Sequence, residues 1–240
     1  MKQKIVNGRW VVWTTNVVAA WDGGTGDYSV RKGWEFERFR SLQENLKFGD
    51  VFFEVGAEHG WMSAIIGREF VGAGNMVLFE PSPEFWVNIW KTWSYNGLDE
   101  PLGCYQGFVG TETTQEPQEG WPAAADQLAP EHPSMAYRVI GKHSDVPATI
   151  TIDDYVRLTG HVPDAINVDV EGAEIHVMRG AVETLRDHKP LVWISIHPDM
   201  LIRDHDSSKE EFLAFMGEQG YSAEFLGTDH EEHWLFRPPA

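Results

Sequence analysis

Basic residues, cysteines and long apolar runs are all scarce in this chain, and each scarcity excludes something. Its 240 residues include 19 Lys and Arg against 37 Asp and Glu, giving a net charge of −18. Phosphates and anionic membranes need a basic face, so the composition argues against nucleic-acid and membrane partners. Cys104 is the single cysteine, so no intrachain disulfide can form and a reducing, cytoplasmic location is expected. No apolar run is long enough to span a bilayer.

The order of the predicted elements favours an α/β fold. Short apolar strands alternate with amphipathic helices; the strands are at 51–55, 76–79, 166–170 and 191–196, and the helices at 34–47, 61–70, 83–96 and 174–188. This alternation predicts a mainly parallel, doubly wound sheet. The last strands are expected near residues 223–226 and 233–236. We expect a single domain over residues 1–240, because this length is typical of one α/β domain.

Two segments fall outside the alternation of strands and helices. Residues 1–33 are predicted to form an N-terminal arm, with a strand or hairpin at 9–18 and a glycine-bearing loop at 21–33. Residues 111–147 are rich in Pro, Glu, Gln and Ala and contain few periodic apolar residues. We interpret 111–147 as an insertion or lid that packs over one end of the sheet.

An acidic, glycine-bearing turn follows the strand at 51–55. It reads Glu54-Val55-Gly56-Ala57-Glu58-His59-Gly60. Gly56 and Gly60 would let the backbone approach a ligand, with the next helix N-terminus aimed at it. The turn alone is a weak signal, because many strand-to-helix turns carry two glycines for packing only. It also lacks the G-x-G-x-x-G pattern of dinucleotide-binding proteins, and Glu58 would repel a pyrophosphate.

A further acid, Glu80, indicates that the turn binds a cofactor. It ends the strand at 76–79, 20 residues after Gly60 (80 − 60). An acid at about this distance commonly binds the ribose hydroxyls of an adenosine-bearing cofactor. A cofactor without phosphates and with a cationic centre suits the acidic turn better than a dinucleotide does. S-adenosylmethionine has a sulfonium, an ammonium and a ribose diol, and Glu54 with its neighbouring backbone would face its methionine end.

Two acids and a histidine follow the next pair of strands. Asp169 and Glu171 end the strand at 166–170, and His197 ends the strand at 191–196. Neighbouring parallel strands bring their carboxyl ends together, so these three are the candidate catalytic residues. His197 or Asp169 would accept a hydroxyl proton, and Glu171 would orient the acceptor or its partner. The alternatives are a helix N-terminal acid and a hydrogen-bonded structural histidine; a divalent metal is not favoured, and no metal ligands are assigned.

A second histidine-bearing stretch lies near the C-terminus. It reads Asp229-His230-Glu231-Glu232-His233 and resembles a metal-binding pair only by composition. We interpret it as a solvated turn before the last strand.

Together, these motifs resemble the FkbM family of S-adenosylmethionine-dependent methyltransferases. The residues that carry the resemblance are Glu54-Val55-Gly56-Ala57-x-x-Gly60-x-x-Ser63, Phe79-Glu80-Pro81-Ser82-Pro83, Thr151-Ile152-Asp153-Asp154 and Asp169-Val170-Glu171-Gly172-Ala173-Glu174 with Arg179-Gly180-Ala181. The resemblance covers roughly residues 48–198. It implies a Rossmann-like class I methyltransferase fold with an antiparallel C-terminal strand, and S-adenosylmethionine as cofactor. The residues it places at the cofactor are Glu54, Gly56, Ala57, Glu58, Gly60, Ser63, Glu80 and Pro81.

The resemblance also implies a reaction, O-methylation of a hydroxyl on a sugar or natural product, with a small-molecule or glycan acceptor. The chain departs from the family pattern with Glu54 for Asp, Asn167 for Lys, and Ser195-Ile196-His197 for Glu-x-His. The last departure leaves the acceptor chemistry more open than cofactor binding. Two other function classes stay open: a nicotinamide-dependent oxidoreductase, and a non-catalytic carbohydrate-binding protein that uses exposed Trp side chains.

Overall fold

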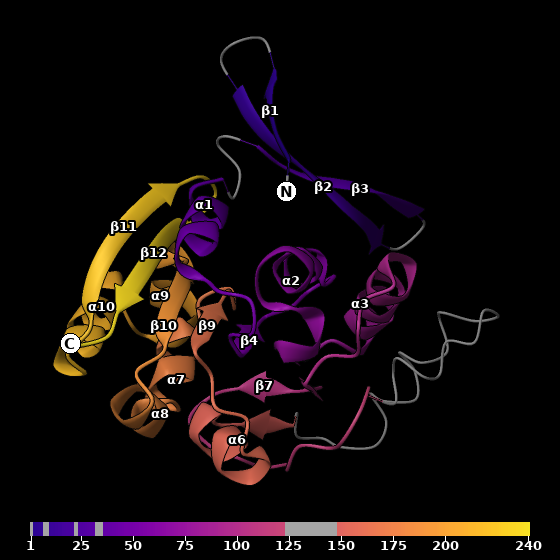
Figure 1. The fold of residues 1–240 in the computed structure, drawn as a ribbon. Coiled ribbons are helices and arrows are strands. Elements are labelled where there is room, and N and C mark those ends of the chain that lie inside the picture. The colour runs from indigo at the N-terminus through magenta and orange to yellow at the C-terminus, as the bar shows by residue number, and fades with distance from the viewer. Residues whose placement is uncertain (1, 7–9, 22–23, 32–35, 123–147) are drawn as a thin grey trace.

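The computed structural model describes residues 2–6, 10–21, 24–31, 36–122 and 148–240 (Figure 1). Its main sheet has seven strands, in the spatial order β11 (Ser222–Thr228), β12 (Glu232–Arg237), β10 (Leu191–Ile196), β9 (Ala165–Val168), β4 (Phe52–Val55), β5 (Met76–Phe79) and β6 (Gly103–Tyr105). The pairs from β10 to β6 are parallel. Strand β12 runs antiparallel to both of its neighbours. The predicted mainly parallel sheet with an antiparallel C-terminal strand is therefore confirmed.

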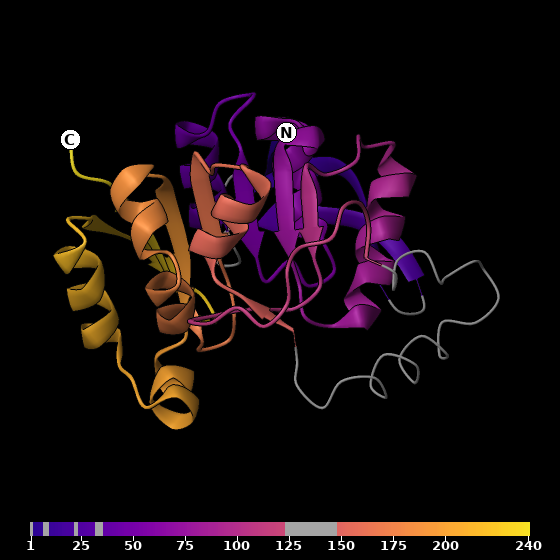
Figure 2. The same cartoon turned by 90° about the horizontal axis from the view of Figure 1, so that it is seen from below.

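Helices cover both faces of this sheet (Figures 1 and 2). One face carries α1 (Phe36–Asn45), α2 (Trp61–Ile66) and α3 (Pro83–Asn96), and the other carries α6 (Ile152–Thr159), α7 (Glu174–Arg179), α8 (Val182–Asp187) and α10 (Lys209–Glu218). Successive strand residues point to opposite faces. Accordingly, Phe52 packs with the first group of helices and Phe53 with the second. In the described part of the chain, no helix combines the length and apolarity needed to cross a bilayer.

The helix predicted at 174–188 is divided into α7 and α8 by Gly180. The carbonyl of Gly180 accepts from the backbone N–H of Asp153 at 3.0 Å instead of continuing a helical ladder. A Cβ at Gly180 would lie 2.0 Å from the carbonyl oxygen of Gly110. Tertiary contact with another segment therefore breaks a helix whose apolar spacing looked continuous.

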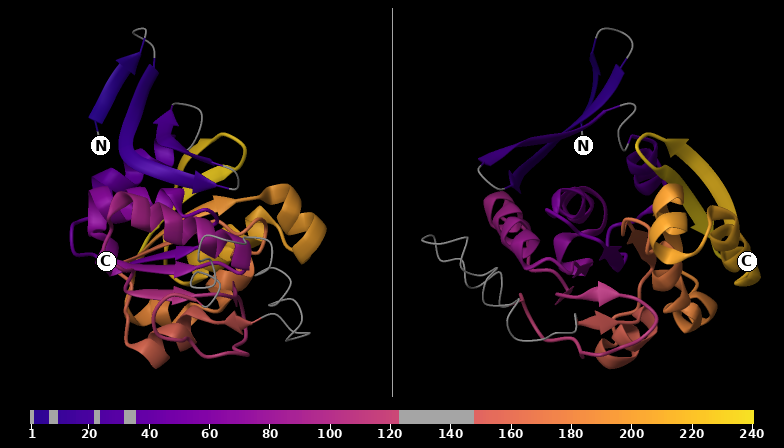
Figure 3. Two further views of the ribbon diagram at one scale, coloured as in Figure 1. Left: turned by 90° about the vertical axis from the view of Figure 1, so that its right-hand side faces the viewer. Right: turned by 180° about the vertical axis from the view of Figure 1, so that it is seen from behind.

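The N-terminal arm forms a separate three-stranded antiparallel sheet of β1 (Lys2–Val6), β2 (Trp10–Trp21) and β3 (Gly24–Arg31). Strand β2 contacts α2 and α3, as Figure 3 shows. The prediction of a loop at 21–33 is wrong for residues 24–31, because pairing with β2 holds this glycine-bearing segment extended. Of the predicted insertion, residues 111–122 contain no helix or strand, and 123–147 lie outside the described residues.

Candidate functional site

A cavity of about 730 Å³ lies at the carboxyl ends of the parallel strands. Turns after β4, β5 and β9 and the β11–β12 hairpin contribute to its wall. The predicted site residues that line it are Glu54, Gly56, Ala57, Glu58, Glu80, Pro81, Asp169 and Glu171. Gly60, Ser63 and His197 are not among its lining residues. The predicted cofactor turn and the predicted reaction site thus share one cavity, where open α/β sheets bind ligands.

Gly56 brings the turn after β4 against the end of β9. Its φ is +90°, and a Cβ there would lie 1.8 Å from the carbonyl oxygen of Asp169. The backbone N–H groups of Gly56 and Ala57 both donate to the carbonyl of Phe79 at 3.0 Å. Gly60 has a different neighbour, because its missing Cβ leaves room for Ile89 of α3. Gly56 shapes the cavity, whereas Gly60 serves helix packing.

Glu80 is fixed in the cavity wall by backbone donors. It is buried; the N–H of Glu58 donates to Oε2 at 2.9 Å and the N–H of Ser82 to Oε1 at 2.8 Å. Burial raises the pKa of Glu80 to about 7, helped by the charges of Glu58 and Glu84 and opposed by the two hydrogen bonds. Each carboxylate oxygen can accept a further hydrogen bond, such as one from a ribose hydroxyl.

Glu54 is held from the neighbouring strand. It is buried on β4, and Oε1 accepts from Asn167 Nδ2 at 2.8 Å. Asn167 stands where the family pattern has Lys, so a neutral amide donor takes the place of a charge pair. The carboxyl group of Glu54 is therefore positioned by an amide rather than by a lysine from β9.

Arg38, which is 131 residues away in the sequence, positions Asp169. This guanidinium, 1% exposed on α1, donates from Nη1 to Asp169 Oδ2 at 3.0 Å and to Ser195 Oγ at 2.5 Å. The sequence analysis missed Arg38, because an arginine in an amphipathic helix usually marks the solvated face. No local motif distinguishes it from its exposed neighbour Arg40.

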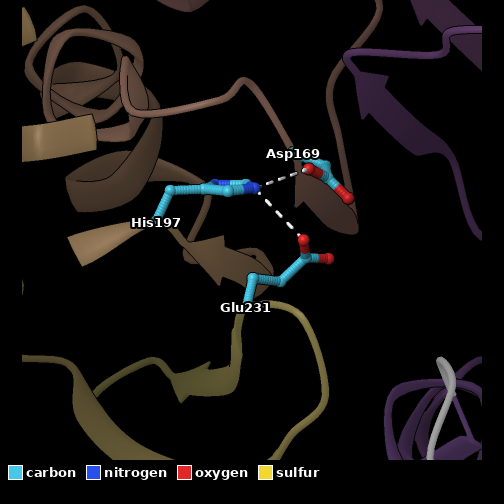
Figure 4. Close-up of side chains that lie close together, drawn as sticks. All are labelled: Asp169, His197 and Glu231. Carbon is cyan, nitrogen blue, oxygen red and sulfur yellow. Dashed lines mark ion pairs between the residues drawn. The ribbon is translucent and has the colours of Figure 1, made fainter. Parts of the chain in front are cut away.

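His197 lies among four carboxylates. Its Nδ1 is 2.7 Å from Oε1 of the fully buried Glu174. Its Nε2 faces Glu231 at 3.1 Å and Asp169 at 3.8 Å (Figure 4). Glu171 lies 3.7 Å from the same nitrogen. Burial lowers the pKa of His197, but the carboxylates outweigh burial, Glu174 and Glu231 foremost, and raise it to about 10. This point of the molecule therefore strongly favours positive charge.

The interpretation of the C-terminal histidine-bearing stretch as a solvated turn holds for His230, which is 41% exposed, and is wrong for three of its neighbours. The side chains of Asp229, Glu231 and His233 are 6%, 1% and 3% exposed. Pairing of β12 with β10 places His233 opposite Ser195 and brings the turn beside His197. Sequence spacing could not reveal this, because the residues meet only through strand order.

An aromatic wall completes the cavity near the N-termini of α2 and α3. His59 stacks on Trp61 with ring centroids 4.9 Å apart and meets the edge of Phe85 at 4.6 Å. Asn88 Nδ2 lies 3.0 Å from His59 Nδ1 and fixes the imidazole. Flat, partly apolar surfaces of this kind suit a planar ring of a ligand.

The charged side chains of the cavity wall are mostly acidic, beside one arginine, Arg38. Burial, and then the charges of Asp169 and Glu171, raise the pKa of Glu58. Glu54, Glu80 and Glu231 add further carboxyl groups to the same wall. Such a cavity favours a cationic ligand over a phosphate-bearing one.

The Methyltransferase FkbM domain family matches residues 54–223, and the chain belongs to this family. The match spans all the motifs that carried the resemblance. It includes Glu54, Glu80, Asp169 and His197, and ends before β12. The assignment as an FkbM-type methyltransferase is therefore confirmed for most of the chain.

A solved structure supports the same fold. An FkbM methyltransferase from Methylobacillus flagellatus superposes with a TM-score of 0.51 at 16% identity, covering 80% of this chain and 45% of that one. This chain thus spans less than half of that protein's length. A precorrin-6y C5,15-methyltransferase from Geobacter metallireducens has a TM-score of 0.49 at 11% identity, covering 86% and 88% of the two chains. No curated protein matches this chain.

Proposed function

We propose that this protein transfers a methyl group from S-adenosylmethionine to a hydroxyl of a small-molecule or glycan acceptor, such as a sugar or natural product. Membership of the methyltransferase family supports the methyl transfer. The cofactor assignment rests on the position of Glu80. This buried acid directly follows β5 and lies in the cavity wall. Ribose hydroxyls of the cofactor would donate to this carboxylate.

The charge of the cavity supports S-adenosylmethionine over a nicotinamide dinucleotide. Glu54, Glu58 and Asp169 line the space next to Gly56, where a pyrophosphate would have to lie. A sulfonium and an ammonium are attracted by these carboxylates, whereas phosphates are repelled. Because the cavity contains no glycine pair of the dinucleotide type, the oxidoreductase alternative has the weaker support.

The proposed reaction is an in-line displacement at the methyl carbon. The acceptor oxygen forms a bond to this carbon while the carbon–sulfur bond breaks, and its electron pair stays on sulfur in S-adenosylhomocysteine. Asp169 would accept the hydroxyl proton, because its carboxylate lines the cavity and is 22% exposed, whereas His197 lies behind it. Glu171, which is 71% exposed, would orient the acceptor.

The carbohydrate-binding alternative depends on exposed tryptophans. Trp86, Trp93 and Trp193 are instead packed in the core and offer no surface for a sugar. Among the tryptophans whose side chains are described, Trp90 is the most exposed at 37%. A single half-exposed ring supports this alternative less than the shared cavity supports methyl transfer.

Calorimetric titration of the purified protein with S-adenosylhomocysteine, S-adenosylmethionine and NAD tests the proposal. We expect micromolar binding of both adenosyl compounds, no binding of NAD, and at least tenfold weaker adenosyl binding in Glu80→Ala. Glu84→Ala is the matched control: Glu84 is an exposed acid four residues away whose charge raises the pKa of Glu80, so its removal should not weaken binding. NAD binding without adenosyl binding, in folded protein, would replace the methyltransferase proposal with the oxidoreductase.

A further inference from the structure

Three potential metal ligands converge at the edge of the cavity. They are Asp169 after β9, His197 after β10 and Glu231 before β12, and one ligand atom from each lies within 4.8 Å of the others (Figure 4). We propose that these three side chains bind a divalent first-row metal ion such as Mn²⁺. One imidazole nitrogen with two carboxylate oxygens is a donor set that such ions accept.

Two of the three ligands are oriented from behind by buried partners. Arg38 holds Asp169 Oδ2 at 3.0 Å, which leaves Oδ1 as the oxygen that faces His197. Glu174, fully buried, holds His197 Nδ1 at 2.7 Å. A carboxylate on the far nitrogen of a histidine fixes the ring and directs the other nitrogen to a metal. The pairs Arg38–Asp169 and Glu174–His197 therefore resemble the outer shell of a metal site.

Among the described residues, the imidazole nitrogen that faces the centre has an ion-pair neighbour but no hydrogen bond. His197 is 8% exposed, and its Nε2 makes no hydrogen bond in the described part of the chain, although Glu231 Oε2 lies 3.1 Å away. Glu231 Oε1 is also buried without a hydrogen bond from the described residues, but it lies on the side of His233, whereas Oε2, which faces His197, also lies 2.6 Å from Nε2 of His230. Buried polar atoms usually have a partner. A cation between Asp169, His197 and Glu231 would supply a partner to His197 Nε2.

A neighbouring cluster of Asp229, Glu231 and His233 also brings potential ligand atoms together. Its histidine, however, already has a protein partner at each ring nitrogen. His233 Nδ1 lies 3.2 Å from Ser195 Oγ, and Nε2 lies 3.0 Å from Asp229 Oδ1. Both ring nitrogens are thus used by the protein. We therefore assign the ion to the side of Glu231 that faces His197.

The proposed ion would be open to the cavity, since Asp169 and Glu231 both line it. This part of the inference rests on the proposed function: an acceptor hydroxyl coordinated to the ion would have a lowered pKa. Its O–H bond would break and the proton would pass to water in the cavity, leaving an alkoxide for the methyl group. With the ion bound, water takes the place of Asp169 as proton acceptor and Asp169 holds the ion; without the ion, Asp169 keeps the role proposed above.

Binding of Mn²⁺ to the full-length protein, freed of metal with a chelator, tests the site directly. We expect electron paramagnetic resonance to show one tight site per chain, and spin-echo measurements to show coupling to a single imidazole nitrogen. His197→Gln should weaken Mn²⁺ binding at least 100-fold and remove this coupling. Glu174→Gln, which changes only the positioning residue, should weaken it 10- to 100-fold.

His233→Gln is the matched control from the neighbouring cluster and should retain Mn²⁺ binding and the nitrogen coupling. Should His197→Gln fail to fold, Glu231→Gln and the wild-type nitrogen coupling test the same assignment. The proposal is overturned if wild-type protein binds neither Mn²⁺ nor competing Zn²⁺, or if the coupling survives in His197→Gln and disappears in His233→Gln. Titration of the same samples with S-adenosylhomocysteine separates the two proposals, because metal binding without cofactor binding removes only the methyltransferase.

Discussion

Glu80 is an acid whose environment favours its neutral form while its predicted ligand favours the charged form. Burial raises its pKa to about 7, with Glu58 and Glu84 as the nearest like charges and two backbone N–H groups as donors. Because this pKa lies above the ordinary value of 4.5, the folded state binds the proton of Glu80 more tightly than the unfolded chain does. The contribution of Glu80 to stability is present at low pH and is lost as the pH rises from about 4.5 to about 7.

Cofactor affinity should change with pH in the opposite direction. Ribose hydroxyls donate to the ionised carboxylate, so affinity for S-adenosylhomocysteine should rise up to about tenfold per pH unit and level off above about pH 7. Calorimetry between pH 5.5 and pH 8 would measure this. Glu80→Gln keeps the shape but cannot ionise, so its affinity should be nearly independent of pH. An unchanged pH profile in Glu80→Gln would assign the titration to another group.

At the scale of elements, the turn after β4 determines whether the two halves of the site meet. Gly56 allows this turn to lie against Asp169, directly after β9, where an added Cβ would overlap the carbonyl oxygen of Asp169. The same turn is bonded to β5 through Phe79. One glycine therefore connects three neighbouring strands at their carboxyl ends.

Gly56→Ala should destabilise the protein by about 4 kcal/mol, because backbone strain at positive φ adds to a steric overlap. Gly49→Ala is the matched control, since Gly49 has a φ of +100° but nothing within 4 Å of an added Cβ. It should cost only about 1–2 kcal/mol of left-handed strain. Urea denaturation followed by circular dichroism measures both. Equal losses for the two variants would show that the close approach to Asp169 does not matter.

At the scale of the whole molecule, the site joins segments that are far apart in the sequence. Arg38 of α1 bonds to Asp169, 131 residues away, and to Ser195, 157 residues away. The C-terminal hairpin adds Glu231 from the other side. The site around Asp169 and His197 is therefore assembled from α1, the ends of β9 and β10, and the β11–β12 hairpin.

Arg38→Ala should lower the free energy of unfolding by about 3 kcal/mol, because it leaves Asp169 among other carboxylates without its guanidinium partner. This is the low end for buried ion pairs, since Asp169 is 22% exposed. Arg40→Ala, on the same helix, removes only exposed pairs with Glu37 and Glu44 and should cost less than about 1 kcal/mol. Chemical denaturation compares the two. A similar small loss for both would mean that Arg38 does not stabilise the fold.

The turns and their acids were predictable because they depend on neighbours in the sequence. Glu54 lies near the end of a short apolar strand, Gly56 and Glu80 directly follow such strands, and all three line the cavity. Arg38 and Glu231 were not predictable, since an arginine on a helix and an acid before a strand look solvated. Their burial depends on which helix covers the sheet and which strand pairs with β10.

The sequence by itself determined the alternation of strands and helices, the family, and the acids that follow β4, β5 and β9, because local periodicity and turn chemistry encode them. Only the tertiary structure decided that β12 lies beside β10 and that Glu231 meets His197. It also decided that the helix predicted at 174–188 breaks at Gly180. These features arise from packing between distant segments, which no local pattern records.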